Sequence, residues 1–186
     1  MGKTKNLFSR EEMFELNVKA LNKRGVTIKD IAEIAFRQQS RWKPDISMRE
    51  CILSVEKILS LRDVFHIVQL GVELDVLTEQ KRLSEPLQTI LDSDLGMFGV
   101  DELFGLEIAG LYGTIGKTNF GEIDVNKPLI IKDLNERGKA DSSECHTFLD
   151  DIVGAIAACA STRVAQVENE IDAHRDPSIT ELKLDI

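Results

Sequence analysis

The stretch Leu149-Asp-Asp-Ile-Val-Gly-Ala-Ile-Ala-Ala-Cys-Ala-Ser161 decides the fold of this chain. From Gly154 to Ser161 it has almost no side-chain bulk, and small side chains allow neighbouring helices to approach closely. Its larger apolar residues recur with helical spacing. The stretch therefore predicts a central, small-residue-rich helix over about 148–170 that other helices surround.

Helix start signals recur on the N-terminal side of this stretch. Ser9 and Glu12 have the spacing of a capping box, in which a hydroxyl and a carboxylate satisfy free amides at a helix start, and they predict a helix over about 10–24. Ser47 and Glu50 repeat the pattern. These signals indicate that the first half of the chain is helical.

The spacing of apolar residues elsewhere completes the prediction of the fold class. A long helix is expected from Val64 to about Leu83, where apolar residues cover much of the helix circumference. No segment has the alternating pattern of a strand. We therefore predict an all-α protein, a single compact domain over residues 1–186 with about six to eight helices and a loosely held tail at 174–186.

Composition restricts the class of function. The 186 residues carry a formal net charge of −9 and the pI is near 4.9, which excludes broad contact with nucleic acid and disfavours adsorption to anionic lipid. No stretch reaches the roughly 20 apolar residues of a membrane-spanning helix, and no apolar region follows the basic start as in a signal peptide. We expect a cytoplasmic protein, with peripheral attachment to a membrane as an alternative.

Two acidic doublets carry the candidate chemistry. Asp101-Glu102 and Asp150-Asp151 each precede an apolar segment with helical spacing, so each places two carboxylates at a helix start. Capping explains either doublet alone, but their joint occurrence, with Lys127 between them, favours a shared site. Four converging carboxylates would repel one another without a divalent cation, and oxygen ligands favour Mg²⁺, with Mn²⁺ as an alternative.

Two neighbours of the second doublet have alternative interpretations. Thr147 lies three residues before Asp150, which is the capping-box spacing, so a structural role for Asp150 is an alternative to metal binding. His146 could act as a general acid or base, although a lone histidine is more commonly a surface residue. Both questions stay open at the level of sequence.

Glycine is concentrated in the second half of the chain. Seven glycines lie between residues 96 and 121, whereas the first 95 residues contain three. Because glycine weakens a helix, this density indicates close helix contacts or a backbone that approaches a ligand, and we place the chemistry within 96–160. Gly113-Thr-Ile-Gly-Lys-Thr118 resembles a fragment of a phosphate-binding loop without its full spacing, and we expect it to line the pocket.

Three ordered motifs in this half resemble a known family. They are Val100-Asp-Glu-Leu-Phe-Gly105, then Asp124-x-x-Lys127-Pro128-x-Ile130, then Leu149-Asp-Asp-Ile-Val-x-x-Ile156, and together they span about 60 of the 186 residues. Their order resembles the phosphatidylglycerophosphatase A family, whose members remove the phosphate from phosphatidylglycerophosphate with Mg²⁺. The family's Pro-Gly-Thr-x-Gly-Ser stretch and membrane-spanning segments are absent, so the chain looks like a soluble branch of the family.

The resemblance implies an Mg²⁺-dependent phosphomonoester hydrolase of phospholipid biosynthesis, with a phosphorylated substrate that is a lipid at the membrane surface. The expected metal ligands are Asp101, Glu102, Asp150 and Asp151; the expected catalytic residues are Asp150, Asp151 and Lys127; the expected substrate-binding residues are Lys127, Asp124, Thr114 and Asn119. Attack by water and attack by a carboxylate are both compatible with these residues.

Two other functions stay open. The first is a soluble phosphatase or pyrophosphohydrolase for a small phosphorylated metabolite; Glu12 and Glu15 form a Glu-x-x-Glu pair, but no Glu-x-x-Asp follows it. The second is a non-catalytic helical module that forms a homo-oligomer through its apolar helix faces. The separation of the two acidic doublets in space distinguishes these functions, because a metal-assisted site requires that the doublets meet.

Overall fold

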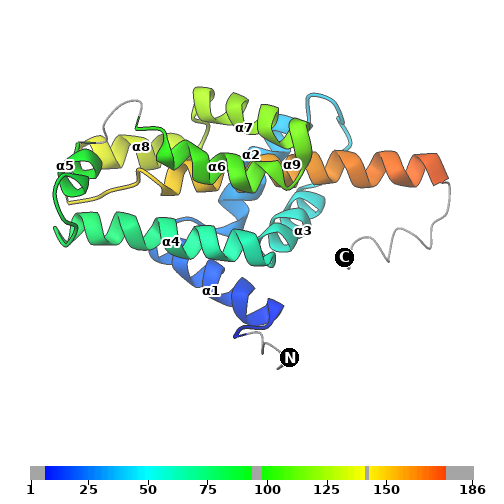
Figure 1. Cartoon of the computed structure of the whole chain (residues 1–186). Helices are drawn as coiled ribbons and strands as arrows, with labels where there is room; N and C mark the ends of the chain where they lie inside the picture. Colours follow the sequence, from blue (N-terminus) through cyan, green and yellow to red (C-terminus); the bar gives the residue numbers. More distant parts are fainter. Residues whose placement is uncertain (1–6, 94–97, 141–142, 175–186) are drawn as a thin grey trace.

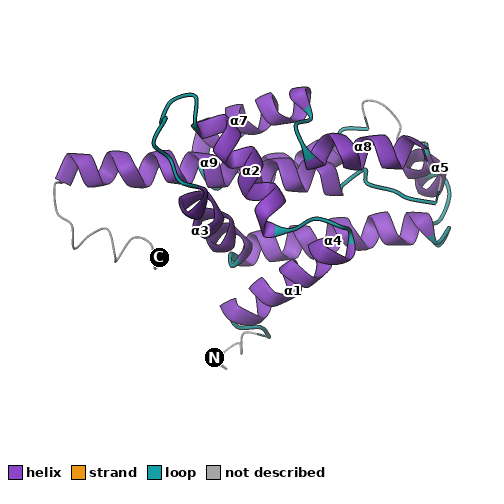
Figure 2. Ribbon diagram, turned by 180° about the vertical axis from the view of Figure 1, so that it is seen from behind, coloured by secondary structure: helices purple, strands orange, loops and turns teal. Residues whose placement is uncertain are grey.

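The computed structural model describes residues 7–93, 98–140 and 143–174, and these residues form nine α-helices and no strand (Figure 1, Figure 2). The all-α prediction is confirmed, with one helix more in the described residues than the upper end of the expected range. In chain order the helices are α1 (Arg10–Lys23), α2 (Ile28–Gln39), α3 (Met48–Leu59), α4 (Arg62–Glu79), α5 (Leu87–Asp92), α6 (Val100–Gly110), α7 (Gly113–Asn126), α8 (Ile130–Ala140) and α9 (Leu149–His174). The tail predicted at 174–186 lies outside the described residues from position 175 onward.

The first three helices begin at capping boxes, of which the sequence analysis predicted those of α1 and α3. At α1 the amide of Glu12 donates to Ser9 Oγ over 3.2 Å, and the amide of Ser9 donates to Glu12 Oε2 over 2.6 Å. The same reciprocal pair starts two further helices, α2 with Thr27 and Asp30, and α3 with Ser47 and Glu50. The carboxylate in each pair therefore accepts a hydrogen bond at the start of its own helix.

The fourth helix is shorter at its C-terminal end than the apolar pattern predicts. α4 ends at Glu79, whereas the prediction extended to about Leu83. Gln80 caps the helix, and Lys81 has a φ of 56°, in the left-handed region that a continuing α-helix cannot include. The apolar residue at Leu83 thus belongs to the turn that leads to α5, and it packs against the core from there.

α9 is the central element of the fold. Every residue from Leu149 to Val164 is buried, and the helix packs against α2, α3, α6 and α7, with lighter contacts to α4 and α8. Figure 1 shows α9 passing behind α6 and α7, with its C-terminal end extending beyond the other helices. The predicted small-residue-rich central helix is therefore confirmed, because its alanines, Gly154 and Cys159 lie where the surrounding helices come close.

The glycines of α6 and α7 allow these two helices to pack closely. A Cβ atom at Gly105 would overlap the ring of Phe120, and a Cβ atom at Gly116 would overlap the carbonyl oxygen of Ala109. Both positions are therefore restricted to glycine by helix packing. The sequence predicted either close helix contacts or a backbone that approaches a ligand in the glycine-rich half. At Gly105 and Gly116 the structure shows close helix contacts.

Candidate functional site

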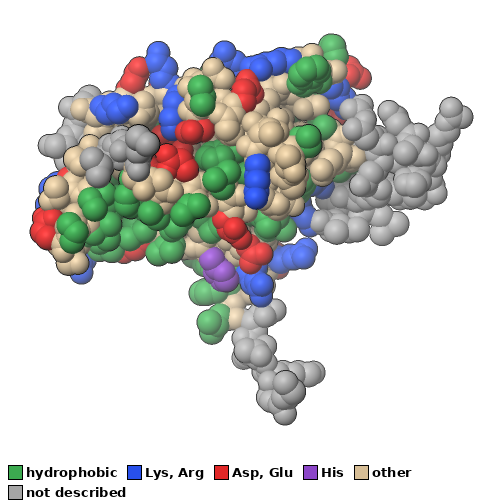
Figure 3. All heavy atoms as spheres, turned by 45° about the horizontal axis from the view of Figure 1, so that its top comes forward, with side chains coloured by type: hydrophobic (Ala, Val, Ile, Leu, Met, Phe, Trp, Pro, Cys, Tyr) green, Lys and Arg blue, Asp and Glu red, His purple; other side chains and the backbone are tan. Residues whose placement is uncertain are grey.

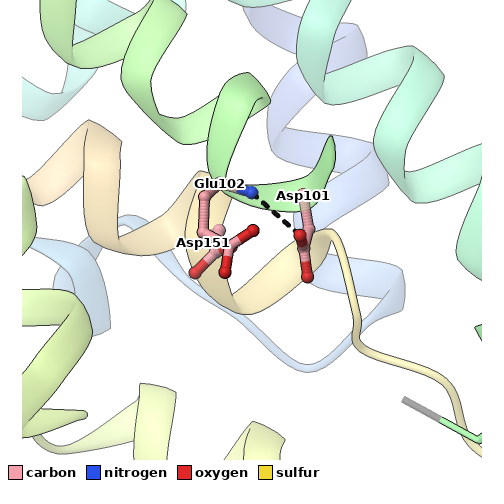
Figure 4. A group of neighbouring side chains, drawn as sticks. All are labelled: Asp101, Glu102 and Asp151. Atoms are coloured by element: carbon pink, nitrogen blue, oxygen red, sulfur yellow. Dashed lines mark hydrogen bonds between the residues drawn. The ribbon is translucent and has the colours of Figure 1, made fainter. Parts of the chain in front are cut away.

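The first turns of α6 and α9 meet, and this contact brings three carboxyl groups together. Asp101 and Glu102 lie in the first turn of α6, and Asp151 lies in the first turn of α9. Each of them has a carboxylate oxygen within 4.8 Å of those of the other two, and Glu102 and Asp151 point toward each other (Figure 4). We call Asp101, Glu102 and Asp151 the three-carboxylate group.

A side chain from α4 holds the start of α9 in place. Asp75 is fully buried and accepts hydrogen bonds from the amides of Phe148 (3.1 Å) and Leu149 (3.0 Å). Burial raises the pKa of Asp75 to about 8, while the two amides and Arg24 act in the opposite direction. Asp75 thereby fixes where the first turn of α9, and with it Asp151, lies.

Asp75 is not among the site residues predicted from the sequence, although the sequence contains a signal for it. Val64, Val68, Gly71 and Asp75 follow one another at intervals of four, three and four, and all of them are buried. An aspartate on the buried stripe of an amphipathic helix must satisfy polar groups elsewhere in the fold, because a buried charge without partners is strongly unfavourable. What it satisfies, however, depends on tertiary packing that the sequence does not show.

Lys127 follows the last residue of α7 and lies beside the acids at the start of α9. Its Nζ lies 2.7 Å from Asp124 Oδ1, 3.0 Å from Asp150 Oδ2 and 3.4 Å from Asp151 Oδ1. The other oxygen of Asp150, Oδ1, accepts the amide of Asp151 over 2.9 Å. Asp150 is thus paired with Lys127 and is not part of the three-carboxylate group, whereas the sequence analysis expected it among the metal ligands.

The pKa values of these side chains reflect an excess of buried negative charge. Burial, followed by the charge of Asp150, raises the pKa of Asp151 to about 9, and Lys127 acts against this rise. Burial and the neighbouring Glu102 raise the pKa of Asp101 to about 7. For Lys127, burial alone would lower the pKa, but Asp150, Asp124 and Asp151 raise it above the usual value.

The residues present fit a hard divalent cation. All three members of the group offer carboxylate oxygen, the ligand that Mg²⁺ prefers. Among the described residues Glu102 Oε2 is buried and has no hydrogen-bond partner, which is a costly arrangement that a cation would relieve. Burial is the largest cause of the raised pKa values of Asp101 and Asp151, and the neighbouring carboxyl groups add to it. A cation would remove this second contribution.

Two expected substrate contacts lie on α7. Thr114 is exposed in the first turn of that helix, and Asn119 donates from Nδ2 to Thr162 Oγ1 on α9 over 2.9 Å. No contact among the described residues joins either side chain to the three-carboxylate group. Their role in binding the substrate stays a prediction.

His146 is buried, so the expectation that it is a surface residue is wrong. Arg24 Nη2 lies 3.2 Å from Nδ1 of His146, and Glu144 Oε2 lies 2.8 Å from Nε2. Arginine only donates and a carboxylate only accepts, so these two contacts favour a proton on Nε2; Arg137 Nη2 also lies 3.4 Å from that nitrogen. Burial lowers the pKa of His146, and both ring nitrogens already have partners in a network with Arg24 and Glu144.

Comparison with known proteins places this geometry in a family. Residues 27–166 match the family model described as phosphatidylglycerophosphatase A. The chain belongs to the phosphatidylglycerophosphatase A family. The match is wider than the three motifs that predicted it, since it includes α2, α3 and α4, and thus Asp75, which holds the start of α9.

Close relatives of this member of the phosphatidylglycerophosphatase A family occur in bacteria. The chain is 49% identical to the uncharacterized protein YutG of Bacillus subtilis over 158 residues, 83% of this chain and 93% of that protein. Two crystal structures are similar: YpjQ of Bacillus subtilis (41% identity, TM-score 0.82, 88% of this chain and 99% of that one) and the low temperature requirement C protein of Listeria monocytogenes (43% identity, TM-score 0.80, 84% and 97%). Within the described ranges, no helix of this family member is long and apolar enough to cross a membrane.

Proposed function

We propose that this protein is an Mg²⁺-dependent phosphomonoester hydrolase whose substrate is phosphatidylglycerophosphate or a closely similar lipid phosphate. The observation that carries the proposal is the meeting of Asp101, Glu102 and Asp151 next to the ammonium group of Lys127. Convergent carboxylates beside a fixed cation are the parts that metal-assisted phosphoryl transfer requires. Family membership supports the same reaction class.

Each residue has a distinct part in the proposed reaction. Asp101, Glu102 and Asp151 would hold Mg²⁺, which supplies Lewis-acid activation of the phosphoryl group and of the attacking water. Lys127 places a positive charge beside them, and Asp124 and Asp150 orient its ammonium group. Of the three contacts of Lys127, the one to Asp151 is the longest at 3.4 Å, so this donor is the one that can turn to a phosphoryl oxygen.

The surroundings of the acids support a substrate with an apolar part. Val100 and Leu103, which flank Asp101 and Glu102 on α6, are 38% and 60% exposed. Figure 3 shows hydrophobic and acidic side chains next to one another on one face of the molecule. A lipid phosphate presents an apolar chain and a charged head at the same time. The exposed apolar side chains would contact the chain, and Mg²⁺ held by the acids, together with Lys127, would contact the head. We therefore favour peripheral action at a membrane surface over action on a soluble metabolite.

The proposal is tested by measuring phosphate release from phosphatidylglycerophosphate in detergent micelles and from a panel of soluble phosphomonoesters, with Mg²⁺, Mn²⁺ or EDTA. We expect release from the lipid with either metal and none with EDTA. Release from soluble substrates alone would replace the lipid by a small phosphorylated metabolite. No release from any substrate would replace the enzyme by a non-catalytic helical module that forms a homo-oligomer.

A further inference from the structure

Lys127 stands where a second metal ion would be expected in a two-metal phosphatase. Two-metal sites hold their ions about 3.5–4 Å apart, with bridging and flanking carboxylates. Here the carboxylates that flank the three-carboxylate group are Asp124 and Asp150, and both contact Lys127 Nζ, at 2.7 and 3.0 Å. The same nitrogen lies 3.4 Å from Asp151, so one ammonium group contacts both flanking acids and one member of the three-carboxylate group.

The backbone at Lys127 indicates that its surroundings hold this position. Lys127 ends α7 with φ 40° and ψ 61°, in the left-handed region that side chains other than glycine and asparagine rarely adopt. Such a conformation persists only where the surrounding structure determines it, and it is concentrated at functional sites. The side chain of Lys127 is only 30% exposed, and its contacts to three carboxylates hold the residue in this conformation.

We propose that the Lys127 ammonium group takes the place of a second divalent ion, so that the site binds one ion per chain. The proposal rests on the function proposed above, because it assigns Mg²⁺ to the three-carboxylate group. Lys127 occupies the oxygens of Asp124 and Asp150 that a second ion would need, and its positive charge repels a cation placed beside it. Phosphoryl transfer then uses one ion from solution and one positive charge built into the chain.

The stoichiometry of Mn²⁺ binding to the full chain, without substrate, tests this inference. Isothermal titration calorimetry counts the ions, and electron paramagnetic resonance distinguishes an isolated Mn²⁺ from a spin-coupled pair. We expect one isolated ion per wild-type chain. Lys127→Met removes the charge but keeps most of the length of the side chain, and it should bind two ions as a coupled pair.

Three further variants make the test specific. Lys132→Met changes an exposed lysine of the neighbouring helix α8 and should keep one ion per chain. Asp124→Asn added to Lys127→Met should remove the second ion again, because it removes one of that ion's ligands. Lys127→Asn also removes the charge, and asparagine tolerates the left-handed backbone, so it replaces Lys127→Met if that variant does not fold. Far-UV circular dichroism and thermal unfolding check each fold.

The outcomes separate this inference from the proposed function. Two ions on the wild type, or one ion on both folded Lys127 variants, would overturn the inference and leave the proposed function standing. No Mn²⁺ on the wild type at millimolar concentration would remove the metal basis of both. One ion on the wild type and two on the Lys127 variants is the result that supports Lys127 as the second cation, whatever the phosphatase assay gives.

Discussion

The acids at the starts of α2 and α3 and those at the starts of α6 and α9 have similar positions in the sequence but different roles in the structure. At α2, Asp30 Oδ2 accepts from the amide and the hydroxyl of Thr27, at 2.8 and 2.6 Å. At α6 the N-cap is Gly99, which has no side chain that could cap the helix. An acid in a capping box is used by its own helix, whereas Asp101 and Glu102 contribute to a group shared with another helix.

The same difference separates the two members of the second doublet. Asp150 has the spacing of a capping box relative to Thr147, and it faces Lys127. Asp151 lies one residue further along, about 100° around the helix, and it is the member that joins Asp101 and Glu102. The two members of the doublet therefore have different partners, Lys127 for Asp150 and the acids of α6 for Asp151.

The most direct test of this difference neutralises one acid of the three-carboxylate group and one acid of a capping box. Asp151→Asn should lower Mg²⁺-dependent phosphate release at least about 100-fold, the upper end of what loss of an outer partner of a metal ligand costs. Asp30→Asn makes the same chemical change in a capping box and should leave the rate unchanged. Comparable losses of rate in the two variants, measured with equal amounts of folded protein, would contradict the distinction.

The second test compares a cap made by a remote side chain with a local one. Asp75→Ala leaves the buried amides of Phe148 and Leu149 without their acceptor and should cost about 2–5 kcal/mol of unfolding free energy. Thr27→Ala removes an exposed cap and should cost about 1 kcal/mol. Urea unfolding monitored by circular dichroism measures both, and a smaller loss for Asp75→Ala than for Thr27→Ala is the result that we would not expect.

The third test uses pH, to which the two kinds of acid respond with opposite sign. The folded metal-free protein holds the pKa of Asp151 at about 9, so it retains a proton that the unfolded chain has already lost. Stability should therefore fall as pH rises from about 4 to about 9, by at most about 1.4 kcal/mol per pH unit for one such group. Asp151→Asn should make this decline shallower, and an unchanged slope would contradict the assignment.

Glu50 supplies the opposite case in the same experiment. Burial alone would raise its pKa, but hydrogen bonds from Ser47 and the neighbouring Lys43 lower it in the folded protein. Its contribution to stability is present at neutral pH and is lost as pH falls through that lowered pKa. The acid limb of the unfolding profile, below about pH 5, should therefore be weakened in Glu50→Gln and unchanged in Asp151→Asn.

The smallest expected effect comes from removing the hydroxyl group of one capping box. Ser47→Ala should destabilise the protein by about 1 kcal/mol, because the amide of Glu50 loses its partner at an exposed helix start. The rate of phosphate release and its dependence on Mg²⁺ should not change. A shift in the Mg²⁺ requirement would show that the capping boxes and the metal site are energetically linked.

The sequence predicted the local features and the meeting of the two acidic doublets, but not the partner that each side chain takes, for physical reasons. Capping boxes placed the starts of the first helices because both partners lie within four residues of each other. The small residues of 154–161 placed the core helix, since their lack of bulk allows neighbouring helices to pack closely. The pairing of Lys127 with Asp150, 23 residues away, and the capping of α9 by Asp75 depend on how helices pack, which spacing does not encode.

Asp75 also has a consequence for how this protein can be altered. All motifs that carry the proposed chemistry lie after residue 96, yet the helix that carries Asp151 is anchored by a side chain from α4. A single residue inserted into α4 before Asp75 would rotate that carboxylate by about 100° around the helix axis, away from the two amides. Residues 96–160 transplanted into another scaffold would therefore lack Asp75, the residue that holds the start of α9. Changes in length should be tolerated in the turns at either end of α4 but not within this helix.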